Sequence, residues 1–350
     1  MIFTRVSIET PTVILPPTVV TSDELEQQLA PVYNRIGLRV GRLELMTGIH
    51  ERRFWAPGTL PSQAAAMAGQ QALAASDLPP EAIGCLINCS VSRDCVEPAT
   101  STFVHHALSL PPSAINFDIS NACLGMVSGI ITLASMIEAG FIEAGLAVSG
   151  EHAEPLVRNT IACLNQGDFN RQTIKPHFAS LTIGSCATAV IVRKTPASAV
   201  ATPLHSLTAA AISADTTNSH LCQGNANGGM TDASAPLMQT DSPELLVQGV
   251  ALATHVWEQL KQTTGWNNDT PDVICTHQVG KGHRALLYET LHLDLTKDYS
   301  TFDRLGNCGS ASLPATVALA AREGCLVAGQ HIALLGIGSG INCCDLTVTW

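Results

Sequence analysis

Cys123 is the residue of this chain best placed to act as a nucleophile. It stands after a short strand-like run, residues 117–119, and a turn of small residues, and before Gly125 and a stretch, residues 126–140, that is apolar on nearly every face. This pattern predicts a strand, a sharp turn and a buried helix. At the start of a helix a thiol meets unsatisfied backbone N–H groups and the positive end of the helix dipole, and both favour the thiolate. We therefore predict that Cys123 can attack a substrate carbonyl that approaches the turn.

Three other polar residues stand at the ends of strand-like runs. Glu97 lies 26 positions before Cys123, and Asn307 follows the run 299–305 and lies 30 positions after His277. Each pair repeats the order strand, loop, helix, strand, loop. A repeated order of this kind indicates a structural duplication in which four loops face one pocket.

Each of these four residues also has a purely structural interpretation. Cys123 is one of twelve cysteines and could be a small core residue, and a histidine at a strand end, such as His277, could be a hydrogen-bonded core residue. Asn307 follows a glycine, as in many turns, and Glu97 precedes a proline in what could be a solvated loop. The functional interpretation therefore depends on the four residues occurring as a set.

The elements that would position these residues alternate between strands and helices, which is typical of layered α/β architecture. The duplication divides the chain into residues 1–197, which carry the cysteine, and residues 198–350, which carry the histidine and the asparagine. A Gly/Asn/Ser-rich stretch, residues 216–234, predicts an exposed loop. The strand-like runs are 82–90, 114–119, 146–150, 187–192, 206–214, 272–276 and 331–335, and the helix-like runs are 100–108, 126–140 and 243–263.

The composition limits the classes of partner. The 350 residues are 46% hydrophobic and 13% charged, which is enough apolar material for a large core. The net charge of −11 argues against nucleic acid and anionic membrane surfaces as partners, and mildly against an acidic carrier protein. The first residues show no signal-peptide pattern and no apolar run is long enough to span a bilayer, so we expect a cytoplasmic protein without a transmembrane segment.

The twelve cysteines predict neither disulfides nor a metal site. No Cys-x-x-Cys pair has zinc-finger spacing, and the adjacent Cys343 and Cys344 are poorly placed to chelate one ion. We expect reduced thiols and no bound metal. His152 and His283 are interpreted as structural or surface residues, with no role in the chemistry.

Taken together, these residues resemble the thiolase superfamily. Cys123, His277 and Asn307 occur in the order of its Cys–His–Asn triad, and the nearest branch is the ketoacyl synthase III type. The segment 47–53 (TGIHERR) resembles the early TGIxxR element of that branch, and 338–340 resembles its C-terminal glycine-rich turn. The match extends from about residue 43 to the C-terminus. It implies an α/β thiolase fold of five layers, αβαβα, built from two pseudo-duplicated halves.

Within this branch, two segments resemble the OleA type of thiolase, which acts in long-chain olefin biosynthesis. Residues 92–98 resemble the segment that carries the catalytic glutamate of that type, at the position of Glu97, where synthases that prime fatty-acid elongation tend to have an apolar residue. Residues 182–187 (TIGSCA) also differ from the Gly-Asp-Gly-Ala of those synthases, which again favours the OleA type. The resemblance implies a homodimer in which Glu97 acts in the site of the partner subunit.

The resemblance also implies a role for each residue. Cys123 would attack an acyl thioester, because a thiolate is a strong nucleophile and also a good leaving group. His277 and Asn307 would donate hydrogen bonds to the oxygen of a second thioester as it becomes an enolate. The backbone N–H groups of Cys123 and Ser339 would form the oxyanion hole for the first acyl carbonyl. Glu97 would remove the α-proton, since a synthase that does not decarboxylate its substrate needs a base.

The predicted function is the head-to-head Claisen condensation of two long-chain acyl-CoA molecules, without decarboxylation, to a β-keto acid or its thioester. Coenzyme A thioesters are the substrates, no further cofactor is expected, and enzymes of olefin biosynthesis would act downstream. One alternative is a ketoacyl synthase III that condenses acyl-CoA with malonyl-carrier protein and releases carbon dioxide. Another is a non-catalytic partner subunit that lends Glu97 to another chain, although the intact triad argues against it.

Overall fold

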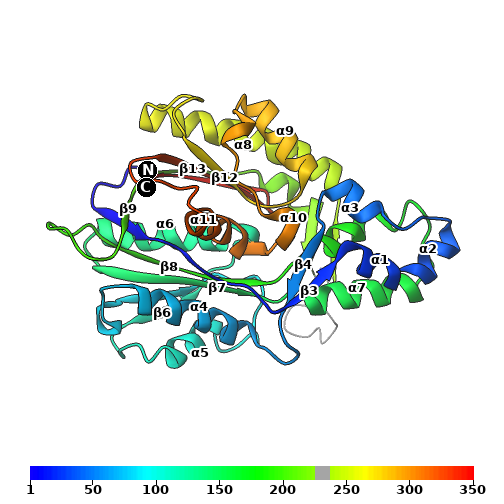
Figure 1. Ribbon diagram of the computed structural model, residues 1–350, viewed down its shortest axis with the longest axis horizontal. Coiled ribbons are helices and arrows are strands. Elements are labelled where there is room, and N and C mark those ends of the chain that lie inside the picture. The colour runs from blue at the N-terminus through cyan, green and yellow to red at the C-terminus, as the bar shows by residue number, and fades with distance from the viewer. Residues whose placement is uncertain (225–236) are drawn as a thin grey trace.

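One long mixed sheet runs through the computed structural model, which describes residues 1–224 and 237–350 (Figure 1). The order of its strands is β12-β13-β14-β9-β1-β8-β7-β5-β6, and β2 pairs with a second part of β8. Two short ribbons, β3 with β4 and β10 with β11, lie outside this sheet. The strands are β1 (Val6–Glu9), β2 (Thr12–Ile14), β3 (Thr18–Thr21), β4 (Glu51–Phe54), β5 (Cys85–Asn88), β6 (Ile115–Asp118), β7 (Ala144–Glu151), β8 (Cys186–Lys194), β9 (Leu204–Ala214), β10 (Cys222–Gly224), β11 (Met238–Thr240), β12 (Val273–Thr276), β13 (His331–Gly338) and β14 (Asn342–Thr349).

Helices occupy the connections between these strands, and four 3₁₀ turns also bear on the site or on the predicted loop. The 3₁₀ turns are η2 (Ala122–Leu124), η3 (Lys175–Thr182), η4 (Thr216–Leu221) and η7 (Gly309–Ala311). The α-helices are α1 (Ser22–Gln28), α2 (Ala30–Ile36), α3 (Arg42–Thr47), α4 (Pro61–Ala75), α5 (Thr100–Ala107), α6 (Gly125–Glu138), α7 (Glu154–Gln166), α8 (Ser242–Thr264), α9 (Lys281–Leu291), α10 (Phe302–Leu305) and α11 (Ser312–Arg322).

The sheet bends around two central helices, and this gives the fold five layers. α6 packs against β7, β8 and β14, and α11 packs against β2, β8 and β12, so both helices lie between the two arms of the sheet. α4 and α5 cover the outer face of one arm, and α8 and α9 cover the outer face of the other. Figure 1 shows the layers from α8 and α9 at the top to α4 and α5 at the bottom. The predicted αβαβα architecture is confirmed.

α6 is the buried helix that the apolar stretch after Cys123 predicts. Met126 and Ile131 are buried on different sides of it. The small polar residues Ser128 and Thr132 lie on the side that is less buried. Because the helix lies in the central layer with strands on both sides, most of its surface is apolar. The apolar sequence and the central position therefore have the same cause.

The predicted elements agree with the observed ones to within a few residues, with one exception. Residues 299–305 do not form a strand, because α10 occupies most of this run and only an isolated bridge joins its start to β12. The side-chain oxygen of Gln278 accepts the N–H groups of Thr301 and Phe302 at 2.7 and 3.0 Å. These N–H groups are satisfied by a side chain, so the segment needs no strand partner.

Two further predictions concern the division of the chain into halves and the loop 216–234. The division between residues 197 and 198 falls in the connection between β8 and β9, and the duplication of the two halves stays a prediction. The predicted loop 216–234 begins as η4 and continues into β10, while 225–236 lie outside the described residues. In the described ranges, no helix is both long and apolar enough to cross a bilayer.

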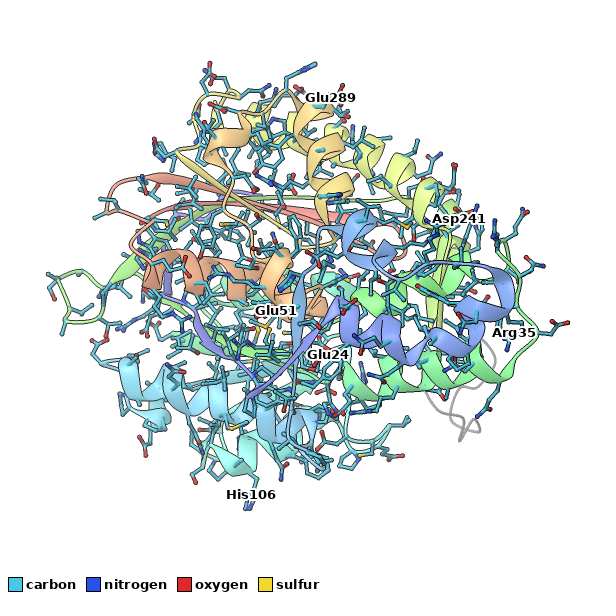
Figure 2. All side chains as sticks on the ribbon, turned by 45° about the vertical axis from the view of Figure 1, so that its right-hand side comes forward. Glu24, Arg35, Glu51, His106, Asp241 and Glu289 are labelled. Carbon is cyan, nitrogen blue, oxygen red and sulfur yellow. The ribbon has the colours of Figure 1, made fainter. Side chains whose placement is uncertain are left out.

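A lobe of α1, α2, α3, α7 and η3 extends from one end of the sheet, on the right in Figure 1. In Figure 2, the charged side chain of Arg35 lies on the outside of this lobe. The TGIxxR-like segment joins the lobe to the body through the fully buried Arg52, which donates to Ser22 Oγ at 3.0 Å and to the carbonyl oxygen of Leu181 at 3.2 Å. Burial lowers the pKa of the Arg52 guanidinium to about 10. The segment is therefore structural in the described chain, since Arg52 holds α1 and η3 of the lobe against β4.

Candidate active site

Cys123 lies in a sharply bent turn, η2, between β6 and α6. Ala122, the residue before it, has a φ of 44°, in the left-handed region that few residues other than glycine adopt. A side chain at Gly125 would overlap the carbonyl oxygen of Cys89, directly after β5. The start of α6 is therefore pressed against the sheet, and the half-buried Cys123 is held at a fixed place. We call residues 121–126 the nucleophile corner.

The surroundings of Cys123 do not favour the thiolate, so this part of the prediction is wrong. Burial raises the pKa of the thiol to about 12, and the nearby Cys222 and Glu151 raise it further, while hydrogen bonds from its own N–H and from Asn307 act against this rise. α6 begins only at Gly125, so the thiol precedes the helix rather than lying in its first turn. At neutral pH the resting nucleophile is a thiol, which has to lose its proton when it attacks.

Asn307 lies close to Cys123. Its side-chain oxygen accepts hydrogen bonds from the N–H of Gly309 at 2.9 Å and from Ser312 Oγ at 3.4 Å, which leaves the amide NH₂ for the Cys123 thiol, whose pKa it lowers. A side chain at Gly306, which has a φ of +65°, would collide with the carbonyl oxygen of Thr182. The Gly-Asn pair is therefore more than a turn, because it aims an amide donor at the nucleophile. We call residues 306–312 the donor loop.

His277 follows β12 directly, at the end of the sheet where the nucleophile corner lies. Its N–H donates to the carbonyl oxygen of Leu335 in β13 at 2.9 Å. Burial lowers the pKa of the imidazole to about 3, and His283 close by lowers it further, so the ring is neutral at physiological pH. Within residues 1–224 and 237–350, its Nδ1 has no hydrogen-bond partner. A neutral imidazole with a free ring nitrogen can exchange a hydrogen bond with a substrate.

The glycine-rich turn at Ser339 closes the other side of the nucleophile corner. The amide of Asn342 donates to the carbonyl oxygen of Ser339 at 3.3 Å and to the side-chain oxygen of Asn121 at 3.1 Å. A side chain at Gly338 would come within 2.9 Å of Leu124 Cγ. The turn is thus fixed against the residues that flank Cys123. The predicted oxyanion hole requires the Ser339 turn to lie at this place.

Glu97 is not brought to Cys123 within one chain. It lies on an exposed loop, residues 91–98, which we call the base loop. The start of this loop is held by Glu151, which accepts the N–H groups of Val91 and Ser92 at 2.9 and 3.1 Å. Asp94 accepts the N–H of Ser62 at 2.8 Å. The loop is therefore anchored at its start while Glu97 itself projects from the surface.

Two buried groups near the site were missed from the sequence. Glu151 is the last residue of β7, and it lies close enough to Cys123 to raise the pKa of the thiol. His283, which we had interpreted as structural or surface, lies near His277, and burial lowers its pKa to about 4. The signal for Glu151 was present, since an ionisable residue directly after an apolar strand-like run is the same pattern that marked His277.

Two surface hollows of the described chain lie away from the triad residues. One of about 470 Å³ is lined by residues of β3 and α1, and one of about 290 Å³ lies between α1 and α3. Neither includes a triad residue, so neither marks the site of the chemistry. In the part of the chain that the structure describes, no group of three or more His, Cys, Asp or Glu side chains could hold a metal ion.

Comparisons with known proteins identify the family of this chain. A family model of the C-terminal part of 3-oxoacyl-[acyl-carrier-protein] synthase III matches residues 261–350, which include His277 and Asn307. A protein of Shewanella oneidensis named acyl-CoA:acyl-CoA alkyltransferase is 37% identical over 350 residues, and one of the same name from Xanthomonas campestris pv. campestris is 34% identical. Both comparisons cover 100% of this chain and 100% of the relative.

Solved structures of Xanthomonas campestris OleA share the whole fold. A glutamate-to-glutamine variant has a TM-score of 0.93 at 33% identity and covers 100% of this chain and 98% of its own. A cysteine-to-serine variant with bound lauric acid and lauroyl-CoA has a TM-score of 0.91 at 33% identity, covering 99% of this chain and 100% of its own. This chain therefore belongs to the thiolase superfamily, in the branch of OleA and the acyl-CoA:acyl-CoA alkyltransferases.

Proposed function

We propose that this protein joins two long-chain acyl-CoA molecules head to head by a Claisen condensation without decarboxylation. Full-length similarity to acyl-CoA:acyl-CoA alkyltransferases and to OleA supports this reaction. The observation in the chain that carries it is the position of the Asn307 amide close enough to Cys123 to lower the pKa of the thiol, because it brings an oxyanion donor to a nucleophile. The product is a β-keto acid or its thioester, which enzymes of olefin or ketone biosynthesis would consume. We place the reaction in the cytoplasm, where acyl-CoA substrates occur.

In the first half-reaction, Cys123 Sγ attacks the carbonyl carbon of one acyl-CoA. The new bond to Sγ forms, the bond to the CoA sulfur breaks, and the thiol proton of Cys123 leaves with the CoA thiol. The backbone N–H groups of Cys123 and Ser339 hold the carbonyl oxygen while it carries negative charge. Since burial raises the pKa of Cys123 to about 12, loss of the proton accompanies the attack instead of preceding it.

In the second half-reaction, a base removes a proton from the α-carbon of the other acyl-CoA. Glu97 takes this proton, and His277 and Asn307 donate hydrogen bonds to the thioester oxygen of the enolate. The α-carbon attacks the carbonyl carbon of the acyl group on Cys123, and the bond to Sγ breaks. The sulfur then regains a proton as Glu97 gives one up, which returns both groups to their starting states.

We propose that Glu97 acts in the site of the partner subunit of a homodimer. Glu97 is exposed at the tip of an anchored loop, and Val91 and Val96 of the same loop are 55% and 64% exposed. β6, the edge strand of the sheet in the described chain, lies beside this loop's far end and carries Ile115, which is 41% exposed. An edge strand next to exposed apolar side chains favours association with a second copy.

Incubation of the purified protein with myristoyl-CoA alone tests the proposed function. We expect mass spectrometry to detect a β-keto product that contains both acyl chains. A requirement for a malonyl thioester, with release of carbon dioxide, would identify a ketoacyl synthase III instead. Activity that appears only after a second protein is added would identify a non-catalytic partner subunit.

A further inference from the structure

Glu151 is a buried carboxylate to which the proposed mechanism assigns no step. It is 4% exposed and accepts hydrogen bonds from five donors. Three are backbone N–H groups and two are hydroxyls. The donors are Val91 N at 2.9 Å, Ser92 N at 3.1 Å, Ser92 Oγ at 2.9 Å, Ser149 Oγ at 3.3 Å and Ser310 N at 3.2 Å.

These donors belong to different parts of the chain, which this carboxylate joins. Val91 and Ser92 begin the base loop that carries Glu97, and Ser310 lies in the donor loop that carries Asn307. Ser310 Oγ in turn accepts the N–H of Met126, in the first turn of α6, at 2.9 Å. One side chain therefore connects the base loop and the donor loop, and through Ser310 it reaches the nucleophile corner.

The close packing around this carboxylate leaves little freedom. Gly309 has a φ of +54°, and a side chain there would come within 3.2 Å of the Glu151 carboxyl carbon. The N–H of His152 donates to Ser92 Oγ at 3.0 Å, which fixes the hydroxyl that donates to Glu151. The donor loop and the base loop therefore both contact the Glu151 carboxylate directly.

Only a carboxylate fits this set of partners. All five are donors, and an ionised carboxylate accepts at both oxygens, whereas the glutamine side chain would turn an NH₂ group toward backbone N–H groups. Burial raises the pKa of Glu151, while the hydrogen bonds from Val91, Ser92 and Ser310 lower it. Leaving buried N–H groups without acceptors is unfavourable, so loss of the carboxylate would shift the loops.

We propose that Glu151 is a positioning residue for the condensation step. It fixes the donor loop against the nucleophile corner of its own chain, and it fixes the start of the base loop that carries Glu97 to the site of the partner subunit. This inference rests on the proposed function, since it assumes that Glu97 and Asn307 act in that step. Glu151 acts through these residues and does not touch the reacting atoms. A displacement of catalytic groups by about 1 Å can slow a reaction about 10²-fold.

The test is to measure the two half-reactions separately in Glu151→Gln. Acylation is followed as the burst of CoA released from myristoyl-CoA, and condensation as β-keto product formed from the acyl-enzyme and fresh myristoyl-CoA. We expect acylation to stay within about 5-fold of the wild type and condensation to fall about 10²-fold, as expected for displaced catalytic groups. A purely structural role would reduce the amount of active protein and lower both rates by the same factor.

Glu26→Gln is a matched control. Glu26 is also fully buried and accepts from three backbone N–H groups and one hydroxyl, but its donors lie in the lobe of α1 to α3. The ratio of acylation to condensation should therefore not change in this variant, even if stability falls. The donors to Glu26 are Gly41 N at 2.6 Å, Arg42 N at 3.1 Å, Leu43 N at 3.2 Å and Tyr33 Oη at 3.0 Å.

If Glu151→Gln does not fold, Ser92→Ala provides the same test, because it removes one donor to Glu151 at the start of the base loop. Equal slowing of both half-reactions in either variant, or an unchanged condensation rate, overturns the inference while the wild type still condenses. If the wild type itself forms no β-keto product, the proposed function fails, and this inference fails with it.

Discussion

The nucleophile corner and the base loop are built in opposite ways. At the corner, Gly125 lies against the carbonyl of Cys89 and Gly338 lies against Leu124, so there is no room for larger residues. The base loop is anchored at its start, but Glu97 is exposed in the single chain. One chain therefore assembles the groups for acylation by itself, whereas the group proposed for deprotonation is left for an environment outside that chain.

The two regions also differ in how strongly burial acts on their ionisable groups. Burial keeps both Cys123 and His277 uncharged at neutral pH, because it raises the pKa of the thiol to about 12 and lowers that of the imidazole to about 3. A carboxylate in such a place would resist ionisation, and a base needs its charge. Glu97 is exposed in the single chain, and in the proposed homodimer a second subunit would cover it. We infer that the nucleophile is buried within one chain, whereas the base is buried only when the second subunit binds.

The largest effect is expected for Cys123→Ser, which should lower turnover by about 10⁴-fold or more, because loss of a catalytic nucleophile removes the covalent route. The acyl group from myristoyl-CoA should map to Cys123 in the wild type, as peptide mass spectrometry can show. Cys325→Ser changes an exposed thiol away from the corner and should leave turnover unchanged. Acylation of any other cysteine as the main product contradicts the assignment.

The next effect, on condensation alone, is expected for Glu97→Gln. Glutamine keeps the size of the side chain but cannot take the α-proton, so acylation of Cys123 should stay near normal while product formation falls about 10³-fold. Burst and steady-state measurements separate these two steps. In the wild type, solvent deuterium should enter the α-position of an acyl chain if deprotonation is reversible.

Mixed subunits test the comparison between the two regions directly. A heterodimer of Glu97→Gln and Cys123→Ser chains contains one site with an intact cysteine and an intact glutamate only if Glu97 acts across the interface. Mixing the two inactive proteins and allowing subunits to exchange should therefore restore activity. If mixing restores none after exchange has been verified by mass spectrometry, the base acts within its own chain.

A smaller effect is expected from the two donors. His277→Ala and Asn307→Ala should each lower condensation by about 10²-fold, the usual result of removing one oxyanion donor, and should still form the acyl-enzyme. Because Asn307 lowers the pKa of the thiol, Asn307→Ala should in addition shift alkylation of Cys123 by iodoacetamide to higher pH. His277→Ala should not produce this shift. An unchanged pH profile in both variants would argue against the observed contact.

Much of the site could be predicted because its signals are local. Cys123 and Asn307 stand beside glycines that the backbone needs for close approach, and the strand before His277 is a short apolar run. The buried helix after Cys123 was predicted for the same reason, since its apolar residues cover nearly every face. These features depend on neighbours within a few positions, which sequence reasoning can use.

The predictions were wrong where residues distant in the sequence determine an ionisation state or a local secondary structure. The state of the Cys123 thiol depends on burial and on Glu151, a residue 28 positions away, and not only on the helix that follows. The run 299–305 is partly helical because the side chain of Gln278 accepts its N–H groups. None of these contacts has a sequence pattern of its own.

The smallest effect on activity is expected for Asp345→Asn, which tests whether the nucleophile corner is held by packing alone. Asp345 is 1% exposed on β14, and its Oδ1 accepts the N–H of Gly336 at 3.2 Å, in the strand that leads to the Ser339 turn. Its Oδ2 has no partner among the described residues. Burial raises the pKa of this carboxyl from 3.8 to about 8. The folded protein therefore holds it neutral at pH 7, as it holds Cys123 and His277.

The consequence for stability has a definite sign. Because the folded pKa lies above the unfolded one, the unfolded chain releases this proton first, and the free energy of unfolding falls as pH rises from about 4 to about 8. Asparagine does not titrate, so Asp345→Asn should equal the wild type near pH 4 and exceed it by a few kcal/mol above pH 8. Urea unfolding at several pH values measures this difference, and the acylation rate should not change. A stability difference that does not depend on pH, or slower acylation in the variant, would mean that a charge at Asp345 helps to hold the corner.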